Sequence, residues 1–313
     1  MNSPVLPVLL VGKPWRGGLA RYLRAALHKC FPGQVQWIAT YPESAPARAE
    51  YRRDREAWRE GVRAQIEHAH YRAAIFINLP NVGPLPPRDN HVLWITDDPR
   101  LPASEFSPFS RVYVSDPGYE SAVADLAGTR FAGVVPFAHD PDLHHGEVTR
   151  DGHGICAIAN RDAKRDAHLG ALFRAGLRPR VIGNYFARHP LFWRYPWCFR
   201  PSIKNDAMGA VYGAHALSVN VHAAVVRGGT NMRTFECAGY GVAQVIESRP
   251  GLEQLFEPER EVATYTEVDE AAELVCRLLK DSASRRRLAE RAQQRVRAEH
   301  TYEHRVRQLL YGL

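Results

Sequence analysis

The feature that most constrains the fold is an alternation of short apolar strands with amphipathic helices, which runs along the chain twice. The first round has the length and the Val and Ile content of strands at residues 4–12, 34–40, 73–79, 91–97, 111–116 and 131–137. Helical spacing separates several of them, at 19–31, 46–70 and 118–127. The second round places strands at 154–160, 178–184, 217–223, 242–247 and 261–265, with helices between and after them, including 251–256. Such alternation predicts an α/β fold with mainly parallel sheets, each covered by helices on both faces.

The length of the chain favours two domains. At 313 residues it exceeds the size at which one hydrophobic core usually stops growing, about 250–300 residues. The restart of the alternation predicts a first domain over 1–150 and a second over 151–298, with a last amphipathic helix over 299–313. The polar stretch 138–154 holds four histidines and fits neither period, so we expect a surface linker there. Its histidine spacing matches no recognised metal-binding motif, and no metal site is predicted.

Charge and cysteine content restrict the class of protein only loosely. The formal net charge of +7 suits an anionic ligand, such as nucleic acid, nucleotide phosphate or acidic lipid, and it equally suits solvated helix faces. The five cysteines are scattered and odd in number, which favours reduced thiols and a cytoplasmic location. No apolar run is long enough to span a bilayer, and the first residues lack the pattern of a signal peptide.

Loops that follow parallel strands are where α/β proteins bind ligands, and the first such loop is rich in glycine. Gly17 and Gly18 precede the helix at 19–31, where backbone N–H groups can approach a phosphate or a sugar. A plain tight turn explains the two glycines as well. A second irregular stretch, the aromatic segment 185–200, either lines a pocket or forms a packed loop.

The loop after the strand at 154–160 carries positive charge into the start of a helix. Asn160 and Arg161 end this loop, and Lys164 lies in the first turn. Cations are unfavourable at that end of a helix dipole unless an anion such as a diphosphate compensates them. The alternative is ordinary surface charge, with Asp162 as the helix cap.

A third loop, within "VVRGGTNMRTFECAGYG" at 225–241, combines glycines with a helix start. Gly229, Thr230 and Asn231 lead into the helix, and Thr230 or Asn231 is a suitable N-cap. Glu236 lies too deep in the helix to cap it. Its carboxylate can accept hydrogen bonds from the vicinal diol of a ribose, or it can pair with Arg233 three residues earlier.

The ordered motifs "GGTNMRTFECAGYG", "RPGLEQLFEPEREVATYTEVDEAAELVCRLLKD" and "RVRAEHTYEHRV" resemble the C-terminal half of the CgeB-like spore-protein glycosyltransferase family. This family is a branch of the GT-B nucleotide-sugar glycosyltransferases. "WITDDPR", "VYVSDPGY" and "VVPFAHDPDLH" are similar to its N-terminal half, so the resemblance covers nearly the whole chain.

The resemblance implies two Rossmann-like domains that face each other across a cleft, with the last helix crossing back to the first domain. It implies that Glu236 binds the ribose of a UDP-, dTDP- or GDP-linked sugar, that 229–231 face the donor sugar or diphosphate, and that Arg161 and Lys164 neutralise the diphosphate. Arg233 joins this donor-binding set. Such enzymes need no metal, because basic side chains and a helix N-terminus stabilise the leaving group.

One departure from the pattern leaves the stereochemistry open. Many retaining GT-B enzymes carry two glutamates eight residues apart, and the position eight before Glu236 is Gly228. We therefore expect catalytic groups in the first domain, at Asp97 and Asp98, which end a strand before a proline. A turn-initiating Asx motif is the alternative interpretation of these two residues.

Three functions are consistent with these features. The first is transfer of a sugar from a nucleotide donor to an unidentified acceptor, which could be a protein, a glycan, a small molecule or modified nucleic acid. The second is epimerisation or hydrolysis of the nucleotide sugar itself. The third is a module that binds a nucleotide sugar without catalysis, which the glycine at position 228 suggests. A role in nucleic-acid binding has no supporting motif.

Overall fold

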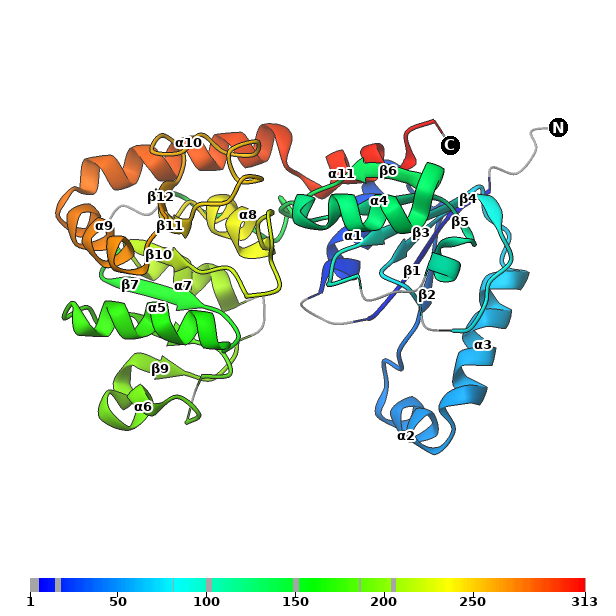
Figure 1. The fold of residues 1–313 in the computed structure, drawn as a ribbon, viewed down its shortest axis with the longest axis horizontal. Coiled ribbons are helices and arrows are strands. Elements are labelled where there is room, and N and C mark those ends of the chain that lie inside the picture. The colour runs from blue at the N-terminus through cyan, green and yellow to red at the C-terminus, as the bar shows by residue number, and fades with distance from the viewer. Residues whose placement is uncertain are drawn as a thin grey trace. The chain divides into compact units, whose positions relative to one another are not determined.

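The computed structural model describes residues 6–14, 18–80, 82–99, 103–148, 152–185, 187–203 and 207–312 (Figure 1). It divides the chain into two compact units: Met1–Pro136 together with Tyr302–Leu313, and Phe137–Thr301. The first unit therefore ends at Pro136 rather than at residue 150, and it includes the terminal segment. Gly17 lies outside the described residues.

The first unit is built on a six-stranded parallel sheet with the strand order β2-β1-β3-β4-β5-β6. Its strands are β1 (Val8–Gly12), β2 (Val35–Ala39), β3 (Ala73–Ile77), β4 (Arg88–Ile95), β5 (Phe109–Val114) and β6 (Phe131–Val134). Its helices are α1 (Leu19–Cys30), α2 (Ala45–Arg53), α3 (Arg55–His68), α4 (Glu120–Ala127) and α11 (Tyr302–Leu310), with 3-10 turns at Ala103–Phe106, Pro117–Tyr119 and Gly128–Arg130. The alternation of strand and helix is as the sequence predicts.

The single helix expected over 46–70 is instead the pair α2 and α3. Asp54 separates them with an extended backbone, and its carboxylate accepts a hydrogen bond of 2.9 Å from the Ala57 amide. Asp54 thereby caps α3, which favours a new helix start over continuation. The α2 helix has no buried residue, so packing does not hold it in line with α3.

Helix α11 packs on α1 within the first unit. The Tyr302 ring stacks on the Tyr22 ring at a centroid distance of 5.4 Å, and both side chains are buried. The buried guanidinium of Arg305 donates to the Pro136 carbonyl at 2.9 Å. These contacts anchor the C-terminal segment to the unit that contains the N-terminus.

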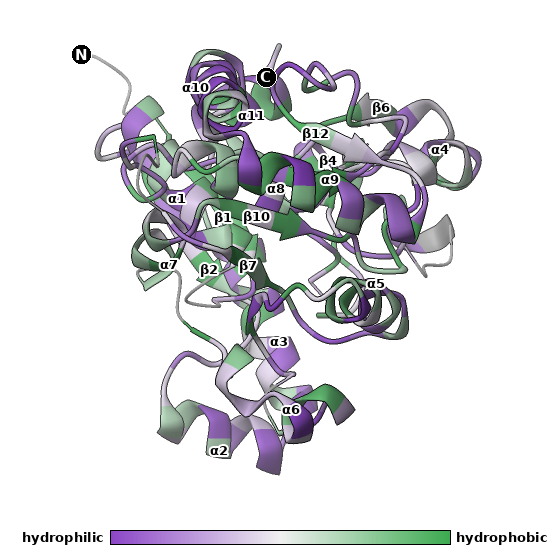
Figure 2. Cartoon of the chain, turned by 90° about the vertical axis from the view of Figure 1, so that its left-hand side faces the viewer, coloured by the Kyte–Doolittle hydropathy of each residue, from purple (hydrophilic) through white to green (hydrophobic). Residues whose placement is uncertain are grey.

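The second unit repeats the architecture with the strand order β12-β11-β10-β7-β8-β9, again parallel. Its strands are β7 (Ile155–Ile158), β8 (Arg180–Ile182), β9 (Phe199–Arg200), β10 (Leu217–Asn220), β11 (Gln244–Glu247) and β12 (Ala263–Tyr265). Its helices are α5 (Ala163–Arg174), α6 (Pro190–Arg194), α7 (Met208–Ala214), α8 (Met232–Gly239), α9 (Val268–Lys280) and α10 (Ser282–Glu299), with a 3-10 turn at Pro196–Cys198. Residues 251–256, expected as a helix, form successive turns. Figure 2 shows mainly hydrophobic strands beneath helices with hydrophilic outer faces, as burial on both faces of a sheet requires.

The stretch expected to be a surface linker packs into the second unit instead. In residues 137–148, hereafter the joining segment, Ala138, His139, Asp140 and His144 are buried. The segment lies against the end of α8, where a Cβ on Gly239 would come within 2.6 Å of the His144 carbonyl oxygen. The expectation of a surface linker is therefore wrong for His139 and His144, whereas His145 and His153 are exposed, because polarity alone does not report burial.

Candidate functional site

The carboxyl edge of the second sheet brings together the loops that follow β7, β10 and β11. These three strands are neighbours in the sheet, so the loops after them converge although they are far apart in the sequence. The loops span residues 159–162, 221–231 and 248–250. Figure 1 shows α5 and α8 following the first two of these loops.

A single carboxylate holds two cations at this edge. Glu247, at the end of β11, accepts a hydrogen bond of 2.7 Å from Lys164 Nζ and one of 2.9 Å from Arg249. The three side chains are only 12–24% exposed. We refer to Lys164, Glu247 and Arg249 as the edge cluster. Its two positive charges exceed its one negative charge, so it attracts an anion, and an arriving phosphate can replace Glu247 as partner.

His222 lies beside the edge cluster and is neutral. Burial, together with the charges of Arg249 and Lys164, lowers its pKa to about 3. The Asn231 amide nitrogen lies 3.1 Å from His222 Nδ1, and because an amide nitrogen only donates, Nδ1 accepts. The proton of the neutral ring is therefore on Nε2, and the imidazole supplies a donor without a charge.

Asn231 is the N-cap of α8, which settles one of the two alternatives in the sequence. Its side-chain oxygen accepts from the Thr234 amide at 3.2 Å, while its amide nitrogen donates to Asn220 at 2.9 Å. Thr230, just before the cap, is 4% exposed, and its hydroxyl has no hydrogen-bond partner among the described residues. A buried hydroxyl at a helix N-terminus, with Gly229 before it, is available to a ligand oxygen.

Arg161 turns away from the edge cluster. Its guanidinium bonds to Asp166 at 2.8 Å and to the Arg188 carbonyl at 2.7 Å. The Asn160 carbonyl accepts from Arg165 at 2.9 Å, so both residues shape the loop after β7. Lys164 is therefore the basic residue that contacts the end of β11, while Arg161 contacts the loop after β8 and Arg165 donates to the Val221 carbonyl in the loop after β10.

Glu236 is buried inside the unit and pairs with Arg233. Its side chain is 2% exposed and accepts a hydrogen bond from the Arg233 guanidinium. Burial disfavours the charge of Arg233, but the neighbouring carboxylate outweighs it and raises the arginine pKa above its usual value. His144 Nε2, from the joining segment, lies 3.8 Å from the other carboxylate oxygen. Of the two partners considered for Glu236, the structure shows the arginine, and a ribose would have to compete with it.

The first unit contains the other predicted site residues. Gly18 is the N-cap of α1 and, because it has no side chain, forms no side-chain hydrogen bond to the first turn of the helix. Asp97 follows β4 and accepts a hydrogen bond of 3.0 Å from Asn78, which has a left-handed backbone with φ of 56°. Asp98 is its neighbour at the same strand end. The Asn78 contact orients the Asp97 carboxylate, which is exposed and accessible to a substrate.

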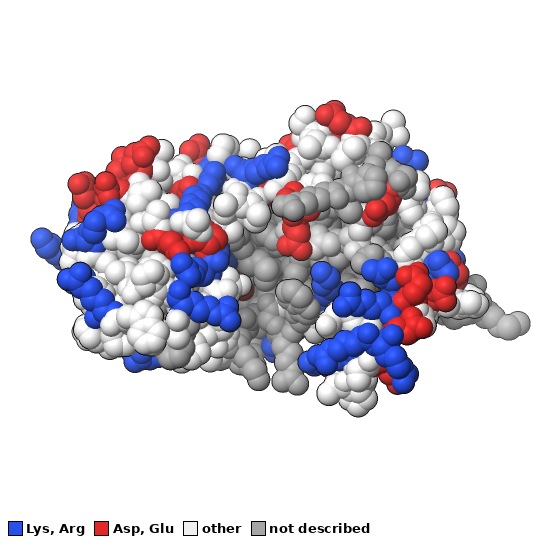
Figure 3. Space-filling view, turned by 60° about the horizontal axis from the view of Figure 1, so that its bottom comes forward, with Lys and Arg blue, Asp and Glu red and all other residues white. Residues whose placement is uncertain are grey.

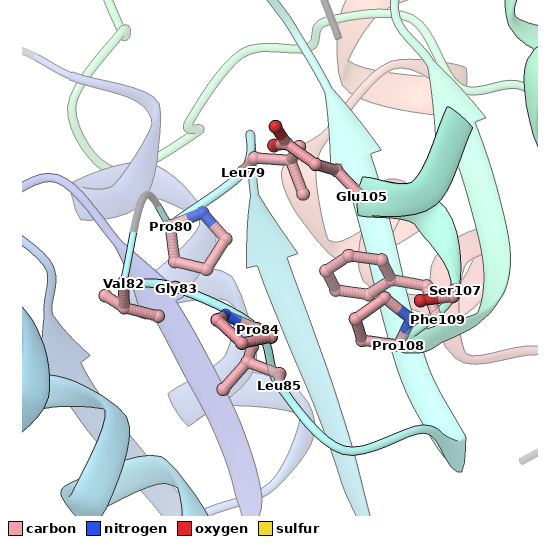
Figure 4. Close-up of a pocket in the computed structure, with 10 residues that line it drawn as sticks. All are labelled: Leu79, Pro80, Val82, Gly83, Pro84, Leu85, Glu105, Ser107, Pro108 and Phe109. Carbon is pink, nitrogen blue, oxygen red and sulfur yellow. The ribbon is translucent and has the colours of Figure 1, made fainter. Parts of the chain in front are cut away.

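A pocket of about 360 Å³ opens on the same unit, between residues 79–85 and the start of β5 (Figure 4). Prolines and aliphatic side chains of the loop after β3 form one wall, and Pro108 and Phe109 form the opposite one. Glu105 and Ser107 supply its polar groups. A mainly apolar pocket with few polar groups suits a small organic ligand.

The described residues contain neither a cluster of metal-ligating side chains nor a helix suited to span a membrane. In the ranges given above, no three or more His, Cys, Asp and Glu side chains are grouped as a metal site would need. None of the helices in those ranges combines the length and hydropathy of a membrane-spanning helix.

Several residues of the site carry no signal in the sequence that we could have used. Glu247 contacts Lys164 across 83 positions, Arg249 joins them through Glu247, and His222 lies in a loop before the glycine-rich motif. The only available hint was position, because Glu247 ends one strand and Lys164 follows another, both expected in the same parallel sheet; in the structure β10 lies between these two strands.

Comparison with known proteins identifies the architecture. Residues 164–311 match the family model described as glycosyl transferase-like. No curated protein sequence matches the chain significantly. HepE of Anabaena, solved in complex with UDP, has a similar structure, with a TM-score of 0.70 and 11% identity over 98% of this chain and 100% of that one.

Two further structures have the same fold. Sucrose-phosphate synthase of Thermosynechococcus elongatus superposes with a TM-score of 0.64 and 14% identity, covering 95% of this chain and 96% of that one. The α,α-trehalose-phosphate synthase (UDP-forming) of Burkholderia xenovorans, solved with glucose-6-phosphate, superposes with a TM-score of 0.60 and 11% identity, covering 95% of this chain and 97% of that one. The two parallel six-stranded sheets with their helices are the GT-B glycosyltransferase fold, as the sequence resemblance implied.

Proposed function

We propose that this chain is a glycosyltransferase of the CgeB-like branch that moves a sugar from a nucleoside diphosphate donor to an acceptor. The observation that carries the proposal is the edge cluster, with two cations on one carboxylate at the carboxyl edge of the second sheet. The match of 164–311 to a glycosyl transferase-like family and the UDP bound to HepE support it.

The second unit binds the donor in this proposal. Lys164 and Arg249 exchange Glu247 for the diphosphate, and the α8 N-terminus with the Thr230 hydroxyl receives the remaining oxygens. The Arg233 side chain, 31% exposed, moves aside so that Glu236 accepts the ribose hydroxyls. Arg161 adds charge from the loop after β7. Because these groups stabilise a departing diphosphate without a metal ion, we propose that the reaction is metal-independent. We also propose that it takes place in the cytoplasm.

The first unit supplies the acceptor side. Asp97 and Asp98 are the groups proposed to activate the acceptor. Gly18, in the loop after β1, is proposed to bind the phosphate or sugar of the donor. Asn78 holds the Asp97 carboxylate, as a general base requires. The pocket beside Phe109 has room for an organic acceptor, whose identity the proposal leaves open. Since Gly228 replaces the first glutamate of the retaining pattern, the proposal makes no choice between retention and inversion.

Calorimetric titration with UDP, dTDP and GDP tests donor binding. We expect saturable binding of one of them, and a loss of about tenfold or more in affinity for Lys164→Met, because a hydrogen bond to a charged group contributes about 1.5–3 kcal/mol. The matched control is Lys280→Met, an exposed lysine at the end of α9, which should leave the affinity unchanged. No binding of any of the three nucleotides by the wild type would refute the proposal.

Transfer is tested separately with labelled UDP-sugars and cell extract. Label on an acceptor that disappears with Asp97→Asn supports the transferase. Free sugar or an epimer formed without extract indicates a hydrolase or an epimerase instead. Binding without any turnover indicates a non-catalytic nucleotide-sugar module.

A further inference from the structure

The segment 174–203 of the second unit has an unusual composition. It contains six arginines and neither Asp nor Glu, and its arginines are Arg174, Arg178, Arg180, Arg188, Arg194 and Arg200. Within it, Trp193 is 76% exposed and Trp197 is 61% exposed. Two large, exposed apolar side chains within one short segment favour a site of interaction over a packed loop. The donor site described above uses neither tryptophan.

The two indoles rest on a rigid aromatic base. Trp193 packs edge-on against Phe192 at a centroid distance of 5.2 Å, and Trp197 packs edge-on against Tyr195 at 5.7 Å. Beneath them Cys198 and Phe199 are buried. These contacts hold α6 and the following 3-10 turn against the unit while both indoles remain exposed.

Arginines frame the same aromatic base. The Arg178 guanidinium lies 4.4 Å from the Tyr195 ring centroid, and that of Arg194 lies 5.4 Å from it. Arg200 donates to the Trp197 carbonyl at 3.1 Å. All three arginines are exposed. Trp193, Trp197, Arg178, Arg194 and Arg200 are called the Trp-Arg surface below.

The position of this surface leaves it accessible. It comprises residues of α6, the following 3-10 turn and β9, together with Arg178 before β8, and β9 is the last strand at one edge of the second sheet (Figure 1). In Figure 3, the lower part of this unit, on the left, is mostly blue and white, so basic and uncharged atoms predominate there. An approaching partner therefore meets positive charge with little negative charge to oppose it.

The chemistry of the Trp-Arg surface selects its partner. Every side-chain polar group on it is a donor, so the partner must supply acceptors and negative charge. Tryptophan is favoured at the boundary between lipid and water, where the ring is apolar and its N–H meets polar head groups. Arginine bonds to phosphate through a planar fork of donors. Both preferences are met by an anionic phospholipid bilayer, whereas a neutral glycan would also need acceptors on the protein.

We propose that the Trp-Arg surface docks this protein on an anionic phospholipid bilayer. The indoles of Trp193 and Trp197 insert at the level of the head groups, and the three arginines contact lipid phosphates. The contact is peripheral. It places the second unit at the membrane independently of what the donor site binds.

Sedimentation with vesicles tests the proposal on the full chain. Vesicles of phosphatidylcholine with phosphatidylglycerol should bind the wild type and shift its tryptophan fluorescence to the blue, while pure phosphatidylcholine vesicles should bind it far less. The double variant Trp193→Ala/Trp197→Ala should lose most of this binding. Its control is Tyr311→Ala, which removes another exposed aromatic ring, 82% exposed, from a different part of the chain.

A charge variant keeps the test valid if the tryptophan variant folds poorly. Arg194→Gln should weaken binding about fivefold, since each basic residue near an anionic surface contributes about 1 kcal/mol. Arg286→Gln, at an exposed position on α10, should not change it. Equal binding to neutral vesicles, unchanged binding of Arg194→Gln, or binding of a polyanion such as single-stranded DNA without any binding of vesicles would overturn the proposal.

Discussion

Substitution of Gly239 by alanine tests whether the joining segment packs on α8. Gly239 ends this helix, and alanine is better than glycine in a helix by about 0.5–1 kcal/mol. On helix propensity alone the variant should therefore be more stable than the wild type. The structure predicts the opposite sign.

The opposite sign follows from the space around the new methyl group. The Cβ would lie 2.6 Å from the His144 carbonyl oxygen and 3.1 Å from His139 Nδ1, whereas an ordinary contact is at least 3.4 Å. Backbone would have to move by about 0.8 Å, and forced overpacking of this kind costs about 1–3 kcal/mol. After the gain in propensity is subtracted, we expect a net destabilisation of up to about 2.5 kcal/mol.

Urea unfolding followed by circular dichroism measures this difference, with Gly213→Ala as the matched control. Gly213 also lies in the last turn of a helix in the same unit, α7, but in the described part of the chain no atom beyond its own helix and chain neighbours lies within 4 Å of its Cβ position. This control should be stabilised by about 0.5–1 kcal/mol. Hydrogen exchange of Gly239→Ala should also rise selectively in residues 137–148. Equal stabilisation of both variants would refute the packing of this segment on α8.

Two further predictions concern buried charges. Arg233→Met should lower the free energy of unfolding in urea by about 3 kcal/mol, because it leaves the Glu236 carboxylate buried without its cation. The double variant with Glu236→Gln should lose less stability than the sum of the two single variants. Additive losses would contradict the pairing. Burial and the charge of Arg88 lower the pKa of His91 to about 4, below the value of about 6.5 in the unfolded chain. The contribution of the neutral His91 to stability is therefore complete above about pH 6.5 and is lost as the pH falls toward 4. The free energy of unfolding, obtained from urea titrations across this range, should fall by up to about 1.4 kcal/mol per pH unit as the pH decreases, and less steeply in His91→Phe. An unchanged slope in this variant would contradict the assignment.

The local part of the candidate site could be predicted because it depends on short spacing. Asn231 as N-cap and the contact of Arg233 with Glu236 follow from positions one turn apart on a helix. The break between α2 and α3 was missed, although Asp54 is a good N-cap, since the periodicity on both sides continued through it. A cap competes with helix continuation, and the balance depends on whether the next turn can be buried.

The distant part of the site could not be predicted. The ion pair of Lys164 with Glu247 depends on which strands are neighbours, and strand order is a property of the whole sheet. The burial of His144 depends on how closely Gly239 lets the joining segment approach α8. Polarity suggested an exposed linker because sequence reports the chemistry of a side chain and not the groups that surround it.

By itself the sequence determined the alternation of strands and helices, the presence of two units and the strand-end loops that carry polar groups. Hydrophobic periodicity and turn residues are local, so they can be recognised without knowing the fold. Tertiary structure decided where the first unit ends, which cation meets which carboxylate, and that Trp193 and Trp197 remain exposed. Those outcomes depend on packing between segments far apart in the chain, where the desolvation of each side chain is set by all of its neighbours together.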